Sequence, residues 1–442
     1  MNDSTDLHHI IIVGGGAGGL ELATSLGKKF AAKGKAKVTL VDCELTHVWK
    51  PLLHEVAAGT LNSYEDEVSY PALAYKNHFI FRIGRMDTLD RENKEISLAP
   101  TSDKDGVEYI PRRTYKYDTL IFAVGSQTND FSIKGVKENC MFLDTRAEAD
   151  SFHHSLLRNA YTAHAQVSPL REGQLKVAIA GAGATGVELS AELHDAFNQL
   201  IKFGIDELHR DKIKITIIEA ADRILPALPP ELSEKTLKAL EKIHIEVLTS
   251  HRIVEATSEG FITDKGGLIP SEIKVWSAGI KAPDFLTNID GLESTGNNRL
   301  VVKQTLETTH DDNIFAMGDC AACPMPGTDV TVPPRAQAAH QQASMLVKTI
   351  KNRLKNKPLP NYHYVDYGSL INLSSYATVG NMMGNLMGKA AGSFMIEGIL
   401  ARLVYLSLYK MHQLAIMGLI RVGLITLANM LTQRTRPRMK FH

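Results

Sequence analysis

One supersecondary unit occurs twice in the chain, and this internal repeat constrains the fold more than any other feature. An apolar run, His9–Val13, leads into a glycine-rich turn and then into a helical pattern over Leu20–Phe30. About 167 residues later, Lys176–Ala180 leads into a second glycine-rich turn and a helical pattern over Val187–Lys202. Units of this kind place parallel strands under covering helices. We therefore expect an α/β protein with two Rossmann-like dinucleotide-binding domains.

The first turn, GGGAGG at residues 14–19, fits the pattern G-x-G-x-x-G between a strand and a helix. Its glycines allow a tight turn, close approach of a pyrophosphate, and close packing of helix on strand. The helix N-terminus adds free N–H groups and a partial positive charge. An aspartate after the next expected strand, Lys37–Val41, can accept hydrogen bonds from ribose hydroxyls. The alternative is a glycine-rich turn without a ligand. The expected binding residues are Gly14, Gly16, Gly18, Gly19 and Asp42.

The second turn, GAGATG at residues 181–186, is followed by an acid at the end of the strand Lys214–Ile218. A carboxylate there repels a 2′-phosphate, which favours NADH over NADPH, although Arg223 nearby weakens that preference. The expected NADH-binding residues are Gly181, Gly183, Gly186 and Glu219. Glu188 lies in the first turn of the following helix, where the helix dipole favours an acid. A ligand contact or a proton-handling, catalytic role for Glu188 is the other interpretation.

Two such units call for two dinucleotides, and the natural pair is a flavin cofactor and a nicotinamide substrate. Here the sequence resembles the two-dinucleotide-binding-domain flavoproteins. The resemblance includes Thr119–Ser126, a strand with a terminal glycine, and the segment IFAMGD at residues 314–319. It implies non-covalent FAD, with Asp319 at the ribityl and pyrophosphate part and Gly125 nearby. It also implies that Gly279 borders the NADH.

Four cysteines are too few for a disulfide framework in 442 residues, which predicts a reducing compartment. No cysteine pair follows Asp42, as the resemblance to disulfide reductases would require, and we expect Cys43 to be a core residue. Cys320 and Cys323 form a C-x-x-C pair. A redox or metal role is one interpretation of the pair. We favour the other interpretation, in which both cysteines are small, inert residues and bind no metal, because the sequence has no second pair of metal ligands.

Two further segments resemble type II NADH:quinone oxidoreductases, the single-subunit respiratory enzymes of bacteria. HVWKPLLHE, residues 47–55, resembles the segment beside the flavin ring, which implies that Lys50 and Pro51 lie close to FAD. PRAQAAHQ, residues 334–341, resembles the quinone-site motif, which implies that Ala336 and Gln337 contact FAD and that Gln337 and Gln341 bind quinone. Residues four apart share one helical face, and amides suit a quinone carbonyl. The alternative is a polar helix face without a ligand. We expect His340 to point off the face that Gln337 and Gln341 share.

The tail from residue 398 to residue 442 contains no Asp or Glu and seven Lys or Arg residues. Its longest uncharged stretch has 12 residues, from Val422 to Gln433, which is too short to span a bilayer. A basic helix pair lying on a lipid bilayer surface fits better. Core helices with a dimer interface are the alternative, and a homodimer is left open. We expect a peripheral protein on the cytoplasmic face of the bacterial inner membrane.

These observations predict a two-domain α/β flavoprotein with a membrane-associating α+β region. The expected FAD domain comprises residues 1–130 and 285–355, the NADH domain residues 131–284, and the C-terminal region residues 356–442. The predicted activity is hydride transfer from NADH to FAD, then electron transfer to a membrane quinone without proton pumping. The alternatives are a sulfide:quinone oxidoreductase, a soluble ferredoxin-type reductase and a signalling flavoprotein. A net charge of zero argues against a nucleic-acid partner.

Overall fold

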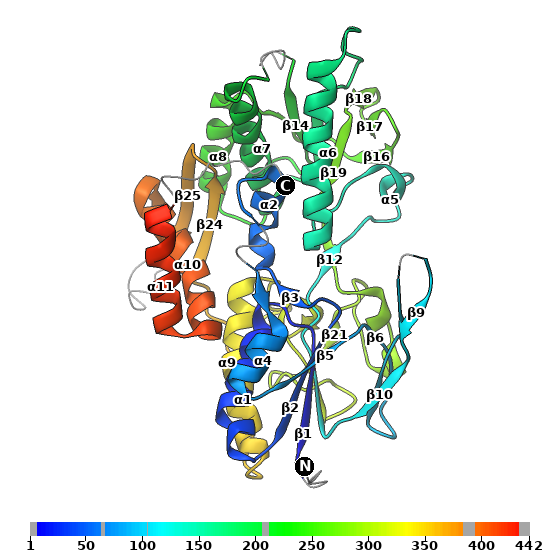
Figure 1. Cartoon of the computed structure of the whole chain (residues 1–442), viewed down its shortest axis with the longest axis vertical. Helices are drawn as coiled ribbons and strands as arrows, with labels where there is room; N and C mark the ends of the chain where they lie inside the picture. Colours follow the sequence, from blue (N-terminus) through cyan, green and yellow to red (C-terminus); the bar gives the residue numbers. More distant parts are fainter. Residues whose placement is uncertain (1–6, 63–66, 104, 206–211, 383–393, 433–442) are drawn as a thin grey trace.

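The computed structural model describes residues 7–62, 67–103, 105–205, 212–382 and 394–432. Figure 1 shows two lobes stacked along the long axis of the molecule. The lower lobe contains β1, β2, α1 and α9, and the upper lobe contains β14, α6, α7 and α8. The C-terminal elements β24, β25, α10 and α11 run along one side of both lobes (Figure 1).

The lower lobe is built on a five-stranded parallel sheet whose central strands are buried. Uninterrupted apolar runs such as HIIIV suit strands covered on both faces. The strand order is β22 (Ile314–Ala316), β11 (Thr119–Phe122), β1 (His9–Val13), β2 (Lys37–Asp42) and β5 (Ile80–Ile83). Helix α1 (Ala17–Lys29) packs against α9 (Ala336–Arg353). Because β22 joins this sheet, the lower lobe takes strands from both sides of the upper lobe in the sequence.

The upper lobe repeats this arrangement on a four-stranded parallel sheet. The strand order is β15 (Glu246–Leu248), β14 (Lys214–Ile218), β13 (Lys176–Ala180) and β19 (Ile273–Trp276). The helices of this lobe are α6 (Arg146–Ala165), α7 (Ala184–Lys202) and α8 (Pro230–Lys242). Helix α6 begins at a capping box between Thr145 and Glu148, which satisfies backbone N–H groups at its start. The predicted strands Lys176–Ala180 and Lys214–Ile218 are confirmed to the residue.

Antiparallel strands and short helices complete both lobes. One three-stranded sheet is β10 (Arg113–Lys116), β7 (Glu95–Leu98) and β6 (Met86–Asp90), and another is β16 (Ile253–Ala256), β17 (Gly260–Thr263) and β18 (Leu268–Pro270). Paired short strands are β3 (Thr46–His47) with β4 (Val68–Ser69), β8 (Thr101–Ser102) with β9 (Glu108–Ile110), β12 (Gln127–Thr128) with β20 (Ile280–Lys281), and β21 (Leu300–Val301) with β23 (Ala321–Ala322). The short helices are α2 (Leu53–Ala58), α4 (Tyr70–Asn77) and α5 (Val136–Asn139).

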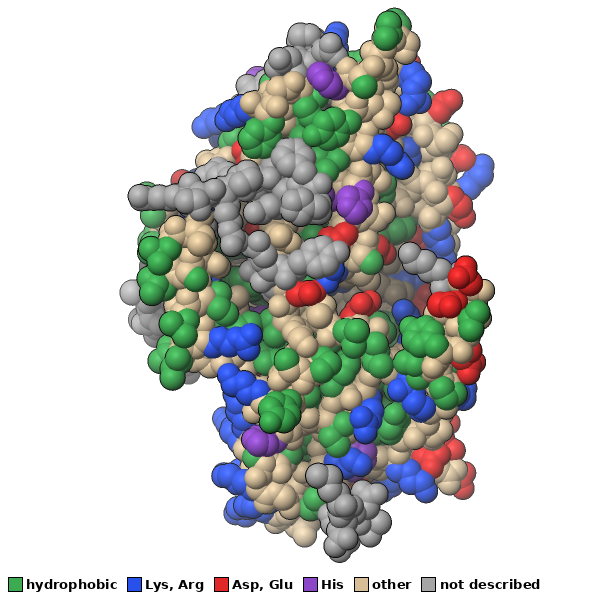
Figure 2. Space-filling view, in the orientation of Figure 1, with side chains coloured by type: hydrophobic (Ala, Val, Ile, Leu, Met, Phe, Trp, Pro, Cys, Tyr) green, Lys and Arg blue, Asp and Glu red, His purple; other side chains and the backbone are tan. Residues whose placement is uncertain are grey.

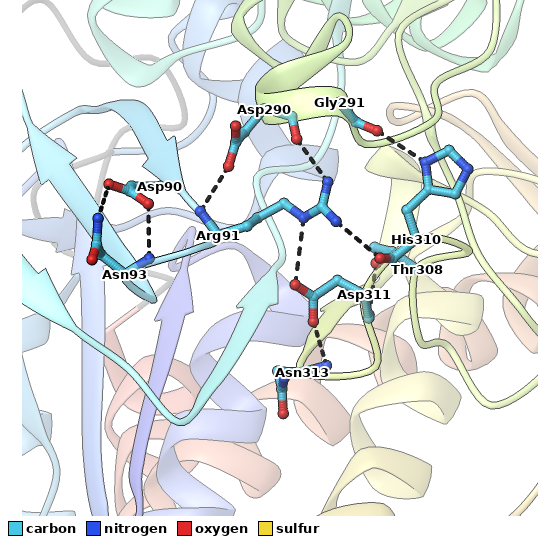
Figure 3. Close-up of polar contacts among 9 residues, drawn as sticks. All are labelled: Asp90, Arg91, Asn93, Asp290, Gly291, Thr308, His310, Asp311 and Asn313. Carbon is cyan, nitrogen blue, oxygen red and sulfur yellow. Dashed lines mark hydrogen bonds and ion pairs between the residues drawn. The ribbon is translucent and has the colours of Figure 1, made fainter.

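Arg91 fastens the β6–β7 hairpin to the segment that returns the chain to the lower lobe (Figure 3). Its guanidinium donates to the carbonyl of Asp290 at 2.8 Å and to that of His310 at 3.0 Å. It also forms an ion pair with Asp311 at 3.4 Å. These contacts join residues about 200 positions apart, so they fix the return of the chain before β22.

The C-terminal region consists of an antiparallel sheet and two helices. The sheet is β24 (Gly368–Leu373), β25 (Ala377–Met382) and β26 (Phe394–Glu397), and the helices are α10 (Gly398–Met417) and α11 (Leu419–Thr432). The sheet packs on α7 and α8 of the upper lobe, while α10 also contacts α1 of the lower lobe. No described helix is long and apolar enough to cross a membrane. The predicted basic residues Arg434, Arg436, Arg438 and Lys440 lie outside the described residues.

Candidate functional site

The two glycine-rich turns have the same geometry, so the sequence repeat is also a structural repeat. Gly14 and Gly181 open the turns with φ angles of +104° and +95°, which favour glycine. A Cβ on Gly19 would lie 1.9 Å from the carbonyl oxygen of Gly14, and one on Gly186 would lie 2.1 Å from that of Gly181. Both close approaches exclude any side chain, so each helix packs directly on the turn that precedes it.

The middle glycine of each turn is open. A Cβ on Gly183 would meet nothing within 4 Å, and one on Gly16 would meet only the carbonyl oxygen of Ala123, at 4.0 Å. Neither α1 nor α7 has a side-chain hydrogen bond capping its N-terminus. Free N–H groups beside an open backbone are what a pyrophosphate requires. The residues present therefore fit the pyrophosphate of a dinucleotide at both turns.

The acids at the carboxyl ends of β2 and β14 brace these turns. Asp42 accepts hydrogen bonds from the N–H of Gly15 at 2.6 Å and of Glu44 at 2.9 Å. Glu219 accepts from the N–H of Ala182 at 2.7 Å and of Ala221 at 2.8 Å. Burial raises the pKa of Asp42, while the backbone N–H groups oppose that rise. Ribose contacts by these two acids remain predictions.

Several residues expected around the flavin meet at the end of β22. The Ser126 hydroxyl donates to the Asp319 carboxylate at 2.8 Å. The Lys50 ammonium donates to the carbonyl of Ser126 at 2.8 Å and to the Asp144 carboxylate at 2.9 Å. Gly125, beside Ser126, has a φ of +69°. Ser126 therefore links Lys50 to Asp319, which are far apart in the sequence.

A single cavity of about 1690 Å³ connects the second glycine-rich turn to helix α10. Pockets for one small ligand usually measure roughly 300–1,000 Å³, so this space exceeds the needs of one molecule. The end in the upper lobe is lined by Gly181, Gly183, Glu219, Trp276 and Gly279. The other lining residues include Trp49, Pro51 and Glu188, Glu21 of α1, Ala336, Gln337 and His340 of α9, and Tyr405, Leu408 and His412 of α10.

The structure places the two predicted quinone glutamines differently. Gln337 lines the cavity, and its amide bonds the backbone of Tyr367 at 3.0 Å and of Gly368 at 3.2 Å. The amide of Gln341 bonds both backbone groups of Val365, at 2.8 and 3.0 Å, and is not among the lining residues. These contacts hold the segment before β24 against α9. The structure therefore brings Gln337, but not Gln341, to the cavity.

His340 was expected to point off the face shared by Gln337 and Gln341 and was left out of the predicted site, but the structure brings it to the cavity. The ring lines the cavity, and its Nδ1 lies 2.6 Å from the carboxylate of Glu21 on α1. The hydrogen bond to Glu21 raises the pKa of His340. No local pattern marks this pair because its members are 319 residues apart.

A junction of aromatic and histidine rings joins the segment of Lys50 and Pro51 to α10. The Nε2 atoms of His47 and His412 lie 2.9 Å apart. Trp49 stacks on Tyr409 and on His412, with ring centroids 5.2 and 5.9 Å apart. Burial lowers the pKa of His47 to about 4 and that of His412 to about 3, so both rings are neutral near pH 7.

Glu188 lines the cavity and is buried, and other titratable residues surround it. Its carboxylate accepts from the N–H of Asn372 at 2.9 Å and lies 3.9 Å from Nδ1 of His54. One ring nitrogen of His54 and one carboxylate oxygen each of Glu55 and Glu192 lie within 4.8 Å of one another. Glu192 was not among the predicted site residues, although carboxylates four residues apart on an otherwise apolar helix were a usable signal.

The cysteines differ in exposure. Cys43 is exposed, so its expected place in the core is wrong. Cys320 and Cys323 are buried free thiols, and burial raises the pKa of each to about 11. A thiol with such a pKa supplies little thiolate, which is the form that attacks a disulfide or binds a metal.

Two strand–glycine–helix units that share one cavity define a class, the reductases that pass electrons between a nicotinamide and a flavin. Comparison with known proteins agrees. The pyridine nucleotide-disulphide oxidoreductase family matches residues 8–343. A type II NADH:quinone oxidoreductase of Haemophilus influenzae is 42% identical over 448 aligned positions, covering 99% of this chain and 100% of that protein. One of Staphylococcus aureus is 30% identical and covers 90% of this chain and 96% of its own length.

Solved structures share the fold. NDH2 from Plasmodium falciparum in complex with NADH superposes with a TM-score of 0.79 at 20% identity, covering 98% of this chain and 100% of that chain. The sulfide:quinone oxidoreductase of Aquifex aeolicus gives a TM-score of 0.72 at 17% identity, covering 97% and 96%. Within the pyridine nucleotide-disulphide oxidoreductases, the chain belongs to the type II NADH:quinone oxidoreductases.

Proposed function

We propose that this protein oxidises NADH and reduces a membrane quinone, with FAD as its bound cofactor. The supporting observation is the continuous cavity, which extends from the second glycine-rich turn past Pro51 and Gln337 to α10. One space of about 1690 Å³ can hold the reacting ends of two substrates close to one cofactor. The relatives in Haemophilus influenzae and Staphylococcus aureus bear the name of this activity.

NADH binds in the upper lobe in this proposal. Gly181, Gly183 and Gly186 hold its pyrophosphate, Glu219 its ribose, and Gly279 borders its nicotinamide end. Arg223 donates to the carbonyls of Pro226 at 2.8 Å and Leu228 at 2.9 Å. That guanidinium is held by its own loop, and the Glu219 carboxylate would repel a 2′-phosphate, which supports NADH over NADPH.

FAD binds in the lower lobe in this proposal. We propose the same FAD domain that the sequence predicted, residues 1–130 and 285–355. When bound, the flavin supplies the chemistry that accepts hydride from NADH and delivers two electrons to quinone. Gly14, Gly16, Gly18, Gly19 and Asp42 form its binding turn. Asp319, which Ser126 holds, is a further expected contact. The remaining expected contacts are Gly125, Lys50, Pro51, Ala336 and Gln337. The chain's own contribution is binding and orientation.

Quinone enters from the side of α10 and α11, which we propose lie on the cytoplasmic surface of the bacterial inner membrane. Figure 2 shows hydrophobic side chains over the region of these helices at the left edge of the molecule. Exposed apolar residues there include Leu400, Leu403, Leu406, Ile420, Leu424, Leu427 and Leu431. Arg402 and Arg421 are exposed among them, which suits anionic lipid headgroups.

The test follows flavin absorbance anaerobically in protein purified with detergent. NADH should bleach the flavin, and a short-chain ubiquinone added next should restore its absorbance promptly. Bleaching without reoxidation by quinone would reject the acceptor and favour a protein acceptor. A flavin that sulfide bleaches and NADH does not would support a sulfide:quinone oxidoreductase instead. The high pKa values of the buried Cys320 and Cys323 thiols argue against that alternative.

A further inference from the structure

The C-terminal ends of α1 and α9 lie at one end of the lower lobe, at the amino-terminal edge of its parallel sheet. Lys37, which follows α1, starts β2 opposite His9 of β1. Arg353, in the last turn of α9, donates to the carbonyl of Asp312, just before β22. Figure 1 shows both helices reaching the bottom of that lobe, so the segments that follow them share one surface.

This surface carries concentrated positive charge. Residues 22–41 contain five Lys and no Asp or Glu, and residues 344–365 contain four Lys, one Arg and no Asp or Glu. We term the nine lysines within residues 28–37 and 348–357 the lysine patch, and all nine are exposed. None of them forms an ion pair within the part of the chain that the structure describes, whereas Lys137 on α5 pairs with Asp130 at 3.3 Å.

The helix dipole accounts for only part of the lysine patch. Lys28, Lys29 and Lys351 lie in the last turns of their helices, where the dipole favours a cation. Other members follow the helix ends in loops, where the dipole gives no such stabilisation, namely Lys35, Lys355 and Lys357. Burial and the neighbouring cation Lys76 lower the pKa of Lys28. Like charges gathered in this way repel one another, and a surface of opposite charge relieves that repulsion.

The lysine patch lies on the lobe to which the proposed membrane helices are attached. Ile416, Met417 and Val422, around the turn between α10 and α11, join the core of the lower lobe. Figure 2 shows Lys and Arg side chains along the left edge of that lobe, where Figure 1 places α1 and α9. They lie below the hydrophobic side chains over the region of α10 and α11 (Figure 2). A bilayer that meets the exposed leucines of α11 therefore also faces this positive charge.

We propose that the lysine patch is a second membrane contact, which binds the phosphate headgroups of anionic phospholipids beside α11. This rests on the proposed function, because it takes α11 to lie on the bilayer. Stable attachment to a membrane generally needs two signals, such as an inserted apolar group and a polybasic surface. Helix α11 supplies the first and the lysine patch supplies the second. Two contacts also fix the tilt of the molecule, which holds α10, a wall of the cavity, against the bilayer.

The composition of the patch suits lipid headgroups better than a nucleic acid. Lysine is a flexible point charge that adapts to a mobile layer of headgroups, whereas arginine suits fixed, bidentate phosphate contacts. Arg353 is already held by the carbonyl of Asp312 and by the side chain of Asn313. Residues 28–37 and 348–357 expose no aromatic side chain on which a base could stack.

The test measures sedimentation of the full-length, FAD-loaded protein with vesicles. A variant that combines Lys33→Gln, Lys35→Gln and Lys355→Gln should bind vesicles of phosphatidylcholine and phosphatidylglycerol at least tenfold more weakly. Each lysine close to an anionic surface changes affinity about fivefold. Binding to phosphatidylcholine alone should not change. Reduction of a short-chain ubiquinone should keep its rate, because none of the three lysines lines the cavity.

A matched variant removes the same charge elsewhere. Lys94→Gln, Lys116→Gln and Lys265→Gln combined change exposed lysines beside the antiparallel sheets, on the opposite side of the molecule from α11 (Figure 1). This variant should bind both kinds of vesicle as the wild type does. Arginine at the three patch positions keeps the charge and should keep wild-type binding. Raising NaCl from about 0.1 M to about 1 M shortens the screening length from about 10 Å to about 3 Å, which should abolish the preference for anionic vesicles.

The outcomes separate this contact from the proposed function. If the glutamine variant of the patch bound anionic vesicles as tightly as the wild type, the lysine patch would not be a membrane contact, and the proposed function would stand. Competition by inorganic phosphate at matched ionic strength would indicate a site for free anions and overturn the lipid assignment. Lower activity in native membranes with unchanged vesicle binding would indicate an acidic protein partner instead. A wild type that binds neither kind of vesicle would overturn the proposed membrane location itself.

Discussion

At the residue scale, a methyl group added to the second glycine-rich turn should act differently at two nearby positions. In Gly183→Ala the methyl meets no protein atom within 4 Å and the φ of −71° suits alanine, so folding should be unaffected. The same methyl would occupy space meant for the NADH pyrophosphate. We expect the Kd for NADH to rise about tenfold, or about 1.4 kcal/mol, in a titration of Trp276 fluorescence.

Gly186→Ala is the matched contrast. Its methyl would lie 2.1 Å from the carbonyl oxygen of Gly181, so α7 must shift away from the turn. Overpacking of this kind typically costs about 1–3 kcal/mol, and a lower Tm should accompany the weaker binding. If Gly183→Ala bound NADH as tightly as the wild type, the pyrophosphate would not lie over this turn.

At the element scale, the sequence predicted the repeated units well because their signals are local. An apolar run, a glycine pattern and an acid lie within about 40 residues of each other, and β13 and β14 match their predicted bounds. Helix α6 was missed although the capping-box pair Thr145 and Glu148 marks its start. Contacts across the fold, such as Glu21 with His340, leave no local pattern. Physical principles therefore predicted the turns, but not which side chains from α1, α9 and α10 would share a cavity.

The junction between α10 and the segment of Trp49 should loosen in acid. His47 and His412 bond as neutral rings, and burial holds their folded-state pKa values at about 4 and about 3. Because the ordinary value is 6.5, their contribution to stability is complete above that pH and declines as the pH falls toward about 4. In a Trp276→Phe background, where Trp49 is the remaining tryptophan, its fluorescence should shift to the red across this window.

His412→Phe should weaken that shift, since phenylalanine can stack on Trp49 but cannot be protonated. His363→Phe changes an exposed histidine and should leave the shift as it is. A Trp49 spectrum that stays constant from about pH 7 to about pH 4 would mean that this histidine pair does not control the docking of α10.

At the scale of the whole molecule, α10 is both a wall of the cavity and part of the core. Tyr405, Leu408 and His412 line the cavity, while Ile416 and Met417 join the core of the lower lobe. Deleting residues 399–442 would therefore open the site as well as remove the proposed membrane surface. Charged substitutions on the exposed face of α11 separate the two roles, because they leave α10 in place.

Leu424→Glu combined with Leu431→Glu should release the protein from membranes without damaging the site. Both leucines are exposed, at 63% and 71%, and lie seven residues apart on one helical face. Each buried leucine contributes about 1.5–3 kcal/mol, so losing both should weaken binding to anionic vesicles more than a hundredfold in a sedimentation assay. Reduction of a short-chain quinone should persist, while oxidation of NADH by quinone in native membranes should fall at least tenfold. Val167→Glu, at an exposed apolar residue after α6, should change neither activity. If the double variant still sedimented with vesicles, membrane docking would have to involve a different surface from the exposed face of α11.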